Sequence, residues 1–473
     1  MISSVEEERF IREKHIGDFP KNAIQWCCQE AGIKPTELDH IVYYWNPYTA
    51  LFKRTMHMLR YFPRSLLIAY RRRDKELPMY SLRNTFVNEF GITKRTQFHY
   101  AEHHLCHAAS SFLLSPFSDS AILTIDAAGE WDTTWLGIGN DTNLTRLQSV
   151  SFPHSLGVVY TAITDFLGFK ANSGEGKVMG LAPYGDSERY YPYFKEMIID
   201  NHNGSFSVDL SYFAYHYRGK PDWFSKKFFN VFGAPRQKED LLEQRHNDIA
   251  AALQRRTEEI GISLARWLYE KTKLKHLCLS GGVCLNSVMN GKILEETDFS
   301  ELYIQPAAHD AGGSIGACFL LWNNIMKNKR TFSLNTAYLG PSYNDTEYEN
   351  AISLIKNTSA CMGIKIEKIA NAPIKAAQLI SEGKIIGWFQ DKMEIGPRAL
   401  GNRSIITDPR DPAMKDKLNS RVKFREGFRP FAPSVLEEKL GEWFTQTHPS
   451  PFMLLVYDVI PEKRNQVPAI THI

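Results

Sequence analysis

Apolar residues are grouped along this chain in ways that are typical of buried strands and of helices. Residues 121–126 (AILTID) form an apolar run that predicts a buried strand. Residues 276–294 and 302–324 each begin with such a run, pass through a glycine-containing turn and continue with helical spacing. This alternation of strands and helices predicts an α/β fold. Apolar spacing also predicts helices at residues 21–32, 103–114, 156–168 and 248–272.

Two segments have a less regular pattern. Residues 51–75 combine arginines with aromatic residues and predict a helical hairpin broken near Pro63. Charges of this kind are typical of a solvated surface, although they would also suit a basic surface that attracts an anionic substrate. Residues 205–245 are aromatic and charged without a clear period, so we expect an irregular insertion there. Residues 40–44 predict a short strand.

A change in composition near residues 328–345 predicts a linker. A smaller unit follows, with an expected helix at residues 373–382 and an expected strand at residues 384–389. A chain of 473 residues is too long for one hydrophobic core, which also favours two domains. We expect them at residues 1–335 and 336–473.

Composition excludes several classes of protein. The net charge of +3 is too small to predict binding to nucleic acid. No apolar run approaches the roughly 18 residues of a membrane span. The acidic residues near the start are not followed by the apolar run of a signal peptide, so we expect no membrane contact. The seven cysteines are scattered without a CxxC pair, which indicates reduced thiols in a cytoplasmic protein.

The segment AEHHLCHAASSF at residues 101–112 places three of the 15 histidines within five positions. If this segment is helical, His103 and His107 share one face, which is the spacing of two metal ligands on a helix. A packing or capping role fits the histidines equally well. Asp126 and Asp310 each follow a predicted strand near glycines and would complete a site suited to Fe(II), Mn(II) or Zn(II).

Glycine-rich turns after three predicted strands provide a second group of candidates. Backbone N–H groups in such turns, beside a helix N-terminus, suit phosphates or a nucleotide sugar. Tight turns that need glycine only for its backbone freedom would have the same sequence. Three such turns beside a metal site favour a nucleoside triphosphate. The candidates are Gly129, Ser280, Gly281, Gly282, Asn286, Gly312 and Gly313.

Cationic residues provide the third group. Lys177 lies in GEGKVMG, which lacks the spacing of a phosphate loop, so contact with phosphate or substrate and a plain surface turn are equal alternatives. Residues 394–433 contain further cations among glycines and prolines. Arginine side chains there suit a small planar or tetrahedral anion, and nucleic acid or surface salt bridges are the alternatives. The candidates are Arg398, Arg403, Lys423, Arg425 and Arg429.

Seven ordered motifs carry a family resemblance: EHHLCHAASSF, IDAAGEW, GEGKVMGLAPYG, SGGVCLN, HDAGGSIGA, MEIGPRALGNRSI and KFREGFRPFAPSV. They resemble the motifs of ATP-dependent carbamoyltransferases of the nodulation-factor and antibiotic O-carbamoyltransferase type. The resemblance implies an actin-like ATPase-type domain, similar to threonylcarbamoyl transferases, at residues 1–335. It implies a smaller α/β domain similar to threonylcarbamoyl-AMP synthase at residues 336–473.

The resemblance also implies an O-carbamoyltransferase reaction. Carbamoyl phosphate and ATP would give carbamoyl-adenylate in the smaller domain, and a hydroxyl of a small-molecule or sugar acceptor would take the carbamoyl group in the larger domain. Fe²⁺ would be held by His103, His107, Asp126 and Asp310, and Mg²⁺ would accompany ATP. Ser280, Gly281, Gly282 and Asn286 would lie at the adenosine, and Gly129, Gly312 and Gly313 are further candidates for binding the nucleotide. Catalytic roles would fall to Lys177, Arg398 and Arg403, and binding of carbamoyl phosphate or ATP to Lys423, Arg425 and Arg429. A homodimer is also expected.

Both ends of the chain depart from the family pattern. Family members begin with a strand and a His-Asp-x-Ser-Ala turn before the segment that matches residues 5–10, and they continue beyond Ile473. A shortened chain leaves open a non-catalytic protein that keeps ATP or metal sites. A metallohydrolase in which the histidine pair activates water is a separate alternative. The metallohydrolase would lack an H-E-x-x-H pattern. Insertions at residues 45–80 and 205–245 are expected to select the acceptor.

Overall fold

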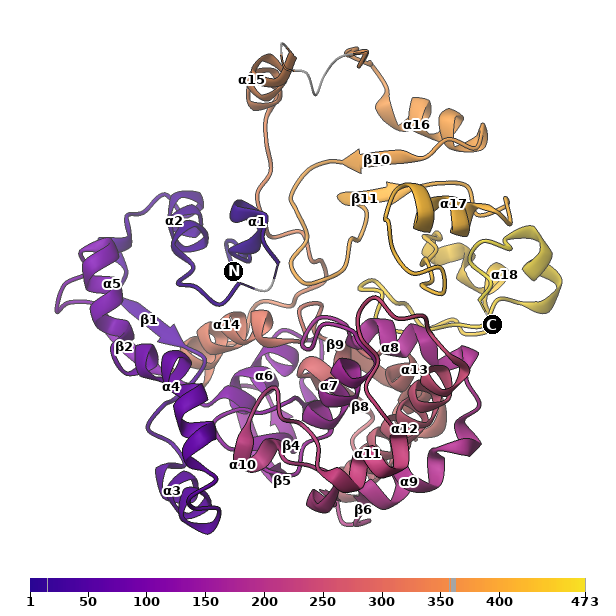
Figure 1. Ribbon diagram of the computed structural model, residues 1–473. Coiled ribbons are helices and arrows are strands. Elements are labelled where there is room, and N and C mark those ends of the chain that lie inside the picture. Colours follow the sequence, from indigo (N-terminus) through magenta and orange to yellow (C-terminus); the bar gives the residue numbers. More distant parts are fainter. Residues whose placement is uncertain (15, 357, 359–362, 473) are drawn as a thin grey trace.

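The computed structural model describes residues 1–14, 16–356, 358 and 363–472, apart from the side chain of Lys75. Figure 1 shows a larger body built around one sheet and a smaller group of C-terminal elements beside it. Among the described residues, every helix falls short of the length or the apolar character that crossing a bilayer requires. The cysteines in this part of the chain are free thiols.

A five-stranded mixed sheet forms the centre of the larger body, with the strand order β5-β4-β3-β8-β9. β3 pairs in parallel with β8, and β8 with β9, whereas β4 runs antiparallel to both of its neighbours. The expected α/β fold is confirmed, and this strand order is that of one half of an actin-like ATPase-type fold. The strands are β3 (Asp119–Ile125), β4 (Asp132–Asn140), β5 (Asn143–Ser151), β8 (His276–Ser280) and β9 (Glu301–Ile304).

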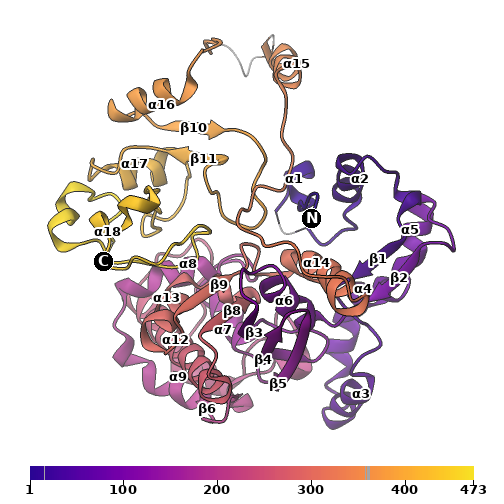
Figure 2. The same ribbon diagram turned by 180° about the vertical axis from the view of Figure 1, so that it is seen from behind.

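Helices cover both faces of this sheet (Figures 1 and 2). α6 packs on β3, β8 and α14, while α12 packs on β3 and β4 together with α7 and α13. Because β3 is buried on both sides, it needs the continuous apolar run from which its strand was predicted. The helices are α6 (His103–Phe112), α7 (Leu156–Phe166), α12 (Gln244–Thr272), α13 (Ser287–Glu296) and α14 (Asp310–Phe319), which continues as a π-helical turn over Leu320–Ile325.

The hairpin of β4 and β5 was not predicted from the sequence. β4 is buried along most of its length, so it lacks the alternation of apolar and polar residues that marks a half-exposed strand. Gly137 and Gly139 also interrupt its apolar pattern. A Cβ at Gly139 would lie 2.3 Å from the ring of Phe112, so the glycine allows α6 to approach the sheet closely.

Residues 205–243 contain only short elements joined by irregular stretches, which confirms the expected irregularity, but the segment packs into the main core. This segment forms short elements whose aromatic side chains, among them Phe206, Phe213 and Phe228, are buried in the main core. The elements are too short for a helical or strand period to be visible in the sequence. Three of these elements lie in the segment itself: β7 (Phe206–Val208), α10 (Tyr215–Arg218) and α11 (Lys226–Phe232). The chain before it forms α8 (Glu175–Leu181), α9 (Tyr191–Met197) and β6 (Ile198–Asp200).

Residues 1–100 form a second, two-stranded sheet and five helices at one side of the larger body. β1 and β2 pair in parallel, and the expected strand at residues 40–44 is confirmed. The expected helical hairpin is confirmed as α3 and α4, which are separated around Pro63. The elements are α1 (Glu8–Ile11), α2 (Lys21–Glu30), β1 (His40–Tyr43), α3 (Leu51–Arg60), α4 (Leu66–Tyr80), α5 (Leu82–Phe90) and β2 (Gln97–Tyr100).

The C-terminal region surrounds one antiparallel pair of strands, β10 and β11. The expected helix at residues 373–382 and strand at residues 384–389 are confirmed. Two small apolar clusters are separate from the main core. The elements are α15 (Asp345–Lys356), α16 (Ala372–Ser381), β10 (Ile386–Phe389), β11 (Arg403–Ile406), α17 (Met414–Arg421) and α18 (Leu440–Trp443). Short 3₁₀ turns occur at Pro35–Glu37, Ala182–Tyr184, Ser187–Arg189, Leu210–Tyr212, Gly282–Leu285, Glu437–Lys439 and Pro461–Gln466.

Residues from both sides of the expected domain boundary pack into one core. The expected linker has no helix or strand between residues 328 and 344, yet its Leu334 is buried in the main core. Ile395 and Leu454 belong to the same core, and the Leu454 carbonyl accepts a hydrogen bond from the Asn290 side chain at 3.0 Å. The C-terminal region is therefore anchored on the larger body, and the boundary at residues 335 and 336 stays a prediction.

Candidate metal centre and cation cluster

The start of α6 is fixed by a buried carboxylate. Glu130 accepts hydrogen bonds from the backbone N–H groups of His103, at 3.1 Å, and Asn46, at 2.6 Å. Because the first N–H groups of a helix have no partner within the helix, a carboxylate at this position stabilises its start. His103 and His107 then lie on one face, as their spacing predicts. Glu130 is absent from the predicted site residues, although its neighbour Asp126 in IDAAGEW is among them.

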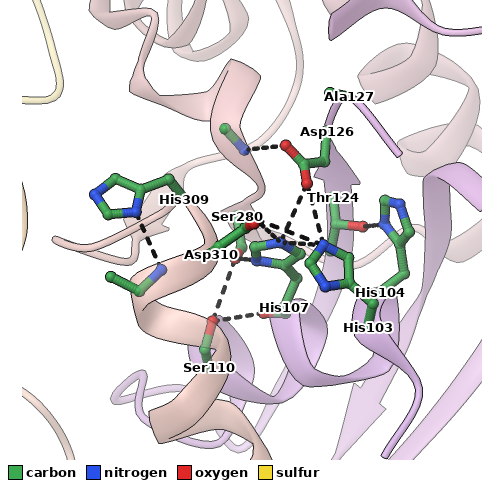
Figure 3. Close-up of polar contacts among 12 residues, drawn as sticks. His103, His104, His107, Ser110, Thr124, Asp126, Ala127, Ser280, His309 and Asp310 are labelled. Carbon is green, nitrogen blue, oxygen red and sulfur yellow. Dashed lines mark hydrogen bonds and ion pairs between the residues drawn. The ribbon is translucent and has the colours of Figure 1, made fainter. Parts of the chain in front are cut away.

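The four predicted metal ligands converge between α6, the end of β3 and the start of α14 (Figure 3). One possible ligand atom from each lies within 4.8 Å of all the others. His103 Nε2 is 3.1 Å from both His107 Nε2 and Asp126 Oδ2. Asp310 Oδ1 is 3.7 Å from both of these imidazole nitrogens. The fold thus brings together residues that are up to about 200 positions apart in the sequence.

These separations fit a shared divalent cation. Ligand atoms about 2.1 Å from one ion in tetrahedral or octahedral geometry lie roughly 3.0–3.5 Å apart, close to the observed distances. Two imidazole nitrogens and two carboxylates form a donor set suited to Fe(II), Mn(II) or Zn(II). The side chain of Asp310 is 59% exposed, whereas both histidines are fully buried, so a substrate would approach from the side of Asp310.

Neighbouring groups orient these side chains. Ser280 Oγ is 3.2 Å from Nδ1 of His107, which leaves Nε2 of that ring directed toward the carboxylates. The backbone N–H of Gly282 donates to Asp126 Oδ1 at 3.1 Å, so Asp126 Oδ2 faces the histidines. Hydrogen bonds of this kind hold metal ligands in position. The Ser280 side chain is fully buried between His107 and Ser110. The sequence placed Ser280 at the adenosine and did not predict this contact with His107.

The carboxylates favour positive charge at the centre of this group. Burial acts to lower the pKa of His107, but hydrogen bonds to Asp126 and Asp310 raise it to about 9. Burial acts to raise the pKa of Asp126, but hydrogen bonds to His103 and His107 hold that pKa well below its usual range. The two aspartates therefore attract a proton or a cation to the same place, and a divalent ion would supply that charge.

His104, the third histidine of the segment, faces away from this group. Its Nδ1 is 2.6 Å from the Thr124 hydroxyl oxygen. Burial, followed by repulsion from the other two histidines, lowers the pKa of His104 well below its usual value, so the ring is neutral. Gly129, a predicted nucleotide contact, packs against this region, since a Cβ there would lie 3.1 Å from the rings of both His103 and His104.

The other predicted nucleotide-contacting glycines lie in close backbone packing. Gly281 has a φ of +92°, and a Cβ there would lie 2.3 Å from the carbonyl oxygen of Ile125, so the turn after β8 requires glycine. A Cβ at Gly312 would lie 2.3 Å from a backbone oxygen, and one at Gly313 would lie 2.9 Å from the ring of Tyr44. The turns border the metal-ligand group, and their contact with adenosine stays a prediction.

Asn286 fixes the start of α13. Its Oδ1 accepts a hydrogen bond from the Met289 backbone N–H at 3.0 Å, as an N-cap residue does. Its side-chain amide also exchanges two hydrogen bonds with the amide of Gln254, at 2.8 and 3.0 Å. The side chain therefore positions the helix that follows the Gly282–Leu285 turn.

Four predicted cations gather in the C-terminal region, and we call them the cation cluster: Arg398, Lys423, Arg425 and Arg429. Burial, followed by repulsion from Arg429, lowers the pKa of Arg398 and lowers that of Arg425 to about 10. Burial, followed by repulsion from Arg425, lowers the pKa of Lys423. The Arg425 guanidinium is held in place by Asn419 Oδ1 at 2.7 Å. An anion placed among these side chains would relieve their mutual repulsion.

The two remaining cationic candidates are paired with carboxylates. Arg403 Nε donates to Glu394 Oε2 at 3.3 Å, and the other oxygen of Glu394 accepts three backbone N–H groups, so the pair stabilises this loop. Lys177 Nζ lies 2.7 Å from Glu426 Oε1, which joins α8 to the loop that carries the cation cluster. Catalytic roles for Lys177 and Arg403 stay predictions.

One turn connects the cation cluster with the metal-ligand group. Arg398 Nη2 lies 3.5 Å from the carbonyl oxygen of Leu285, the last residue of the Gly282–Leu285 turn. The first residue of the same turn, Gly282, contacts Asp126. Arg398 and Asp126 therefore contact opposite ends of the same four-residue turn.

Comparison with known families identifies the class of protein. The family described as "Carbamoyltransferase N-terminus" matches residues 1–319, and "Carbamoyltransferase C-terminus" matches residues 377–473. The chain therefore belongs to the carbamoyltransferase family and is a transferase. The first match contains the four metal-ligand candidates, and the second contains the cation cluster.

Two curated proteins show how far the similarity extends. "Uncharacterized protein sll1178" of Synechocystis sp. is 40% identical over the whole of this chain and 81% of its own length. "Nodulation protein NolNO" of Sinorhizobium fredii is 36% identical over the whole of this chain and 66% of its own length. The chain thus spans about two thirds of the nodulation protein that it matches.

Solved structures are much less similar. HypF of T. kodakarensis matches 51% of this chain and 38% of its own chain, with 12% sequence identity and a TM-score of 0.27. A TM-score this low does not establish a shared fold.

Proposed function

We propose that this carbamoyltransferase uses ATP to convert carbamoyl phosphate into carbamoyl-adenylate and then carbamoylates a hydroxyl of a small-molecule or sugar acceptor. The observation that carries the proposal is that a four-residue metal-ligand group and a cation cluster adjoin one turn in a carbamoyltransferase. Two linked sites of different chemistry suit two consecutive reactions.

The cation cluster supports the activation step. Carbamoyl phosphate and the triphosphate of ATP bring several negative charges together, and these charges repel one another unless cations lie between them. Arg425 and Arg429 are suited to phosphoryl oxygens because a guanidinium can donate two parallel hydrogen bonds. Arg398 and Lys177 are assigned to the reacting phosphates, and Arg403 supports the loop of Arg398 through Glu394.

The proposed reaction has three steps. Water cleaves the mixed carbamic–phosphoric anhydride bond of carbamoyl phosphate and gives carbamate and phosphate. The carbamate oxygen then attacks the α-phosphorus of ATP and displaces pyrophosphate. The acceptor hydroxyl oxygen next bonds to the carbamoyl carbon, the bond to the adenylate oxygen breaks, and AMP and the hydroxyl proton leave.

The metal-ligand group supports the transfer step. A divalent ion such as Fe²⁺, when held by the two histidines and two aspartates, would polarise the carbamoyl and phosphoryl oxygens as a Lewis acid. The chain itself orients the ligands, since Ser280 fixes the His107 ring and Gly282 fixes Asp126. The turns at residues 280–286 and 310–313 are assigned to the adenosine because their backbones border these ligands.

Exchange of labelled pyrophosphate into ATP tests the activation step. The proposal expects exchange only when carbamoyl phosphate is present. Arg429→Gln should abolish most of the exchange, because it removes a member of the cation cluster. Arg421→Gln is the matched control, since Arg421 is exposed on α17 and forms no hydrogen bond or ion pair with any described residue.

Other outcomes would favour the two alternatives. Nucleotide binding without any exchange would indicate a non-catalytic protein that keeps its binding sites. Metal-dependent hydrolysis that proceeds without ATP would indicate a metallohydrolase and would contradict the proposed reaction.

A further inference from the structure

The helices α3 and α4 lie at the periphery of the molecule (Figures 1 and 2). Both helices carry exposed apolar side chains. Single exposed apolar residues are ordinary on a protein surface, but a contiguous set indicates a binding partner. Seven side chains of the hairpin are between 51% and 78% exposed. We call them the hairpin patch: Phe52, Met56, Leu59, Phe62, Leu66, Tyr70 and Leu77.

Helical spacing arranges the hairpin patch in two stripes. The three members on α3 recur at i, i+4 and i+7, and the three on α4 at i, i+4 and i+11, so each set occupies one helix face. Phe62 lies in the short link between the helices. Leu66 and Tyr70 also line a shallow hollow of about 470 Å³ together with Arg64. Each helix of the hairpin therefore exposes one apolar stripe.

Cationic side chains accompany the hairpin patch. Residues 45–73 contain seven Lys or Arg residues and no Asp or Glu. The side chains of Lys53, Arg60 and Arg64 are exposed and form no hydrogen bond or ion pair with any described residue, although both arginines lie over tyrosine rings. The other four cations of this segment, Arg54, Arg71, Arg72 and Arg73, pair with carboxylates. The surface therefore combines large apolar side chains with three cations that have no acidic partner among the described residues.

The inner face of the hairpin is fixed to the larger body. The Arg54 guanidinium donates to the carbonyl oxygen of Glu130 at 3.1 Å, and His57 Nε2 lies 2.6 Å from the carbonyl oxygen of His216. Glu130 is also the residue that stabilises the start of α6. These contacts hold the hairpin in one orientation, with its apolar stripes directed outward.

We infer that the hairpin patch docks on the surface of an anionic lipid bilayer. Side chains such as Phe52 and Phe62 would enter the boundary between headgroups and acyl chains, while Lys53, Arg60 and Arg64 would contact negative headgroups. Such docking needs no membrane-spanning helix. It departs from the sequence expectation of no membrane contact, which rested on the lack of a long apolar run.

Charge and side-chain type favour a bilayer over two other occupants. A symmetric contact with a second copy of the chain would place the unpaired cations against one another. Nucleic acid would use aromatic rings for stacking, but Met56, Leu59, Leu66 and Leu77 offer no stacking surface. An anionic bilayer complements both the apolar and the cationic side chains.

Sedimentation of the full chain with lipid vesicles tests this inference. We expect binding to vesicles that contain phosphatidylglycerol, little binding to pure phosphatidylcholine, and release at high salt. The triple variant Lys53→Glu, Arg60→Glu and Arg64→Glu should weaken binding at least about 100-fold, because each cation near such a surface contributes roughly fivefold. Phe52→Ser with Phe62→Ser should weaken binding independently of charge.

Matched substitutions elsewhere on the surface provide the controls. Lys94→Glu and Leu241→Ser alter exposed residues outside the hairpin and should leave vesicle binding unchanged. Thermal unfolding should be the same for all variants, since none of these side chains is buried. Equal sedimentation with both kinds of vesicle, or with neither, would overturn the inference. So would a dimer in solution that the hairpin substitutions dissociate.

Discussion

The Nε2 atoms of His103 and His107 lie 3.1 Å apart in the interior of the larger body. Two protonated ring nitrogens at this distance would repel each other, so a single proton or cation must lie between the rings and the adjacent carboxylates. The same two nitrogens face Asp126 and Asp310. This arrangement of two imidazoles and two carboxylates therefore favours the binding of one metal ion.

Ser280→Ala is expected to weaken divalent-metal binding by about 10–100-fold without removing a ligand. Ser280 Oγ contacts Nδ1 of His107, and its loss would leave the ring free to rotate away from the carboxylates. Titration with Mn²⁺ in a calorimeter measures the change. Ser111→Ala is the control. Ser111, on α6, is as buried as Ser280, but its hydroxyl contacts only backbone oxygens. Equal metal affinity in both variants would contradict the orienting role.

Arg429→Gln should weaken the binding of inorganic phosphate by roughly tenfold or more, because a hydrogen bond to a charged group contributes about 1.5–3 kcal/mol. The unliganded variant should unfold at the same temperature as the wild type or slightly higher, since repulsion of Arg398 and Arg425 is relieved. Thermal unfolding with and without phosphate measures both effects. Unchanged stabilisation by phosphate would count against an anion site at the cation cluster.

Glu394→Gln should lower the free energy of unfolding by about 1–3 kcal/mol at neutral pH. Burial acts to raise the pKa of Glu394, but backbone N–H groups and Arg403 hold it below its usual value of 4.5. A lowered pKa stabilises the fold above the unfolded value, and that stabilisation is lost as pH falls through the folded value.

The difference between wild type and Glu394→Gln should therefore persist down to about pH 5 and shrink below pH 4.5. Urea unfolding across this range measures it. Glu438→Gln changes an exposed carboxylate and should show no such difference. A gap that widens on acidification would contradict the sign derived from the hydrogen bonds.

Gly281→Ala should destabilise the fold by about 3 kcal/mol or more. The added Cβ combines a left-handed backbone with a contact 2.3 Å from the carbonyl oxygen of Ile125. Gly176→Ala is the control, because a Cβ there meets nothing within 4 Å and alanine favours the helix α8. Denaturant midpoints compare the two variants, and similar values would contradict the tight packing of the turn after β8.

The sequence was sufficient to predict the parts of the centre that depend on local spacing. His103 and His107 share a face because a helix repeats every 3.6 residues, and Asp126 and Asp310 follow apolar strands that end at the same edge of the sheet. The contact of Ser280 with His107 could not be predicted in this way. It depends on the distance between β8 and α6, which is set by packing of distant segments.

Other features could not be predicted, also for physical reasons. β4 is buried on both sides, so its sequence lacks the alternation by which strands are recognised. The aromatic residues of 205–245 pack through short elements, each with too few residues to show a period. The sequence of residues 51–75 does not show whether the apolar stripes of α3 and α4 are exposed. Apolar helical spacing indicates that a helix has an apolar face, but not whether another element covers that face.

Metal content of the purified chain tests the central claim most directly. The chain would be loaded with Fe²⁺ in the absence of oxygen, freed of unbound metal and analysed by mass spectrometry for wild type and His107→Ala. His99→Ala is the control, since His99 lies 3.1 Å from His40 in a separate histidine pair. We predict one ion per chain in the wild type and the control and none in His107→Ala. A wild-type chain without metal, or a His107→Ala variant that keeps it, would contradict the proposed centre.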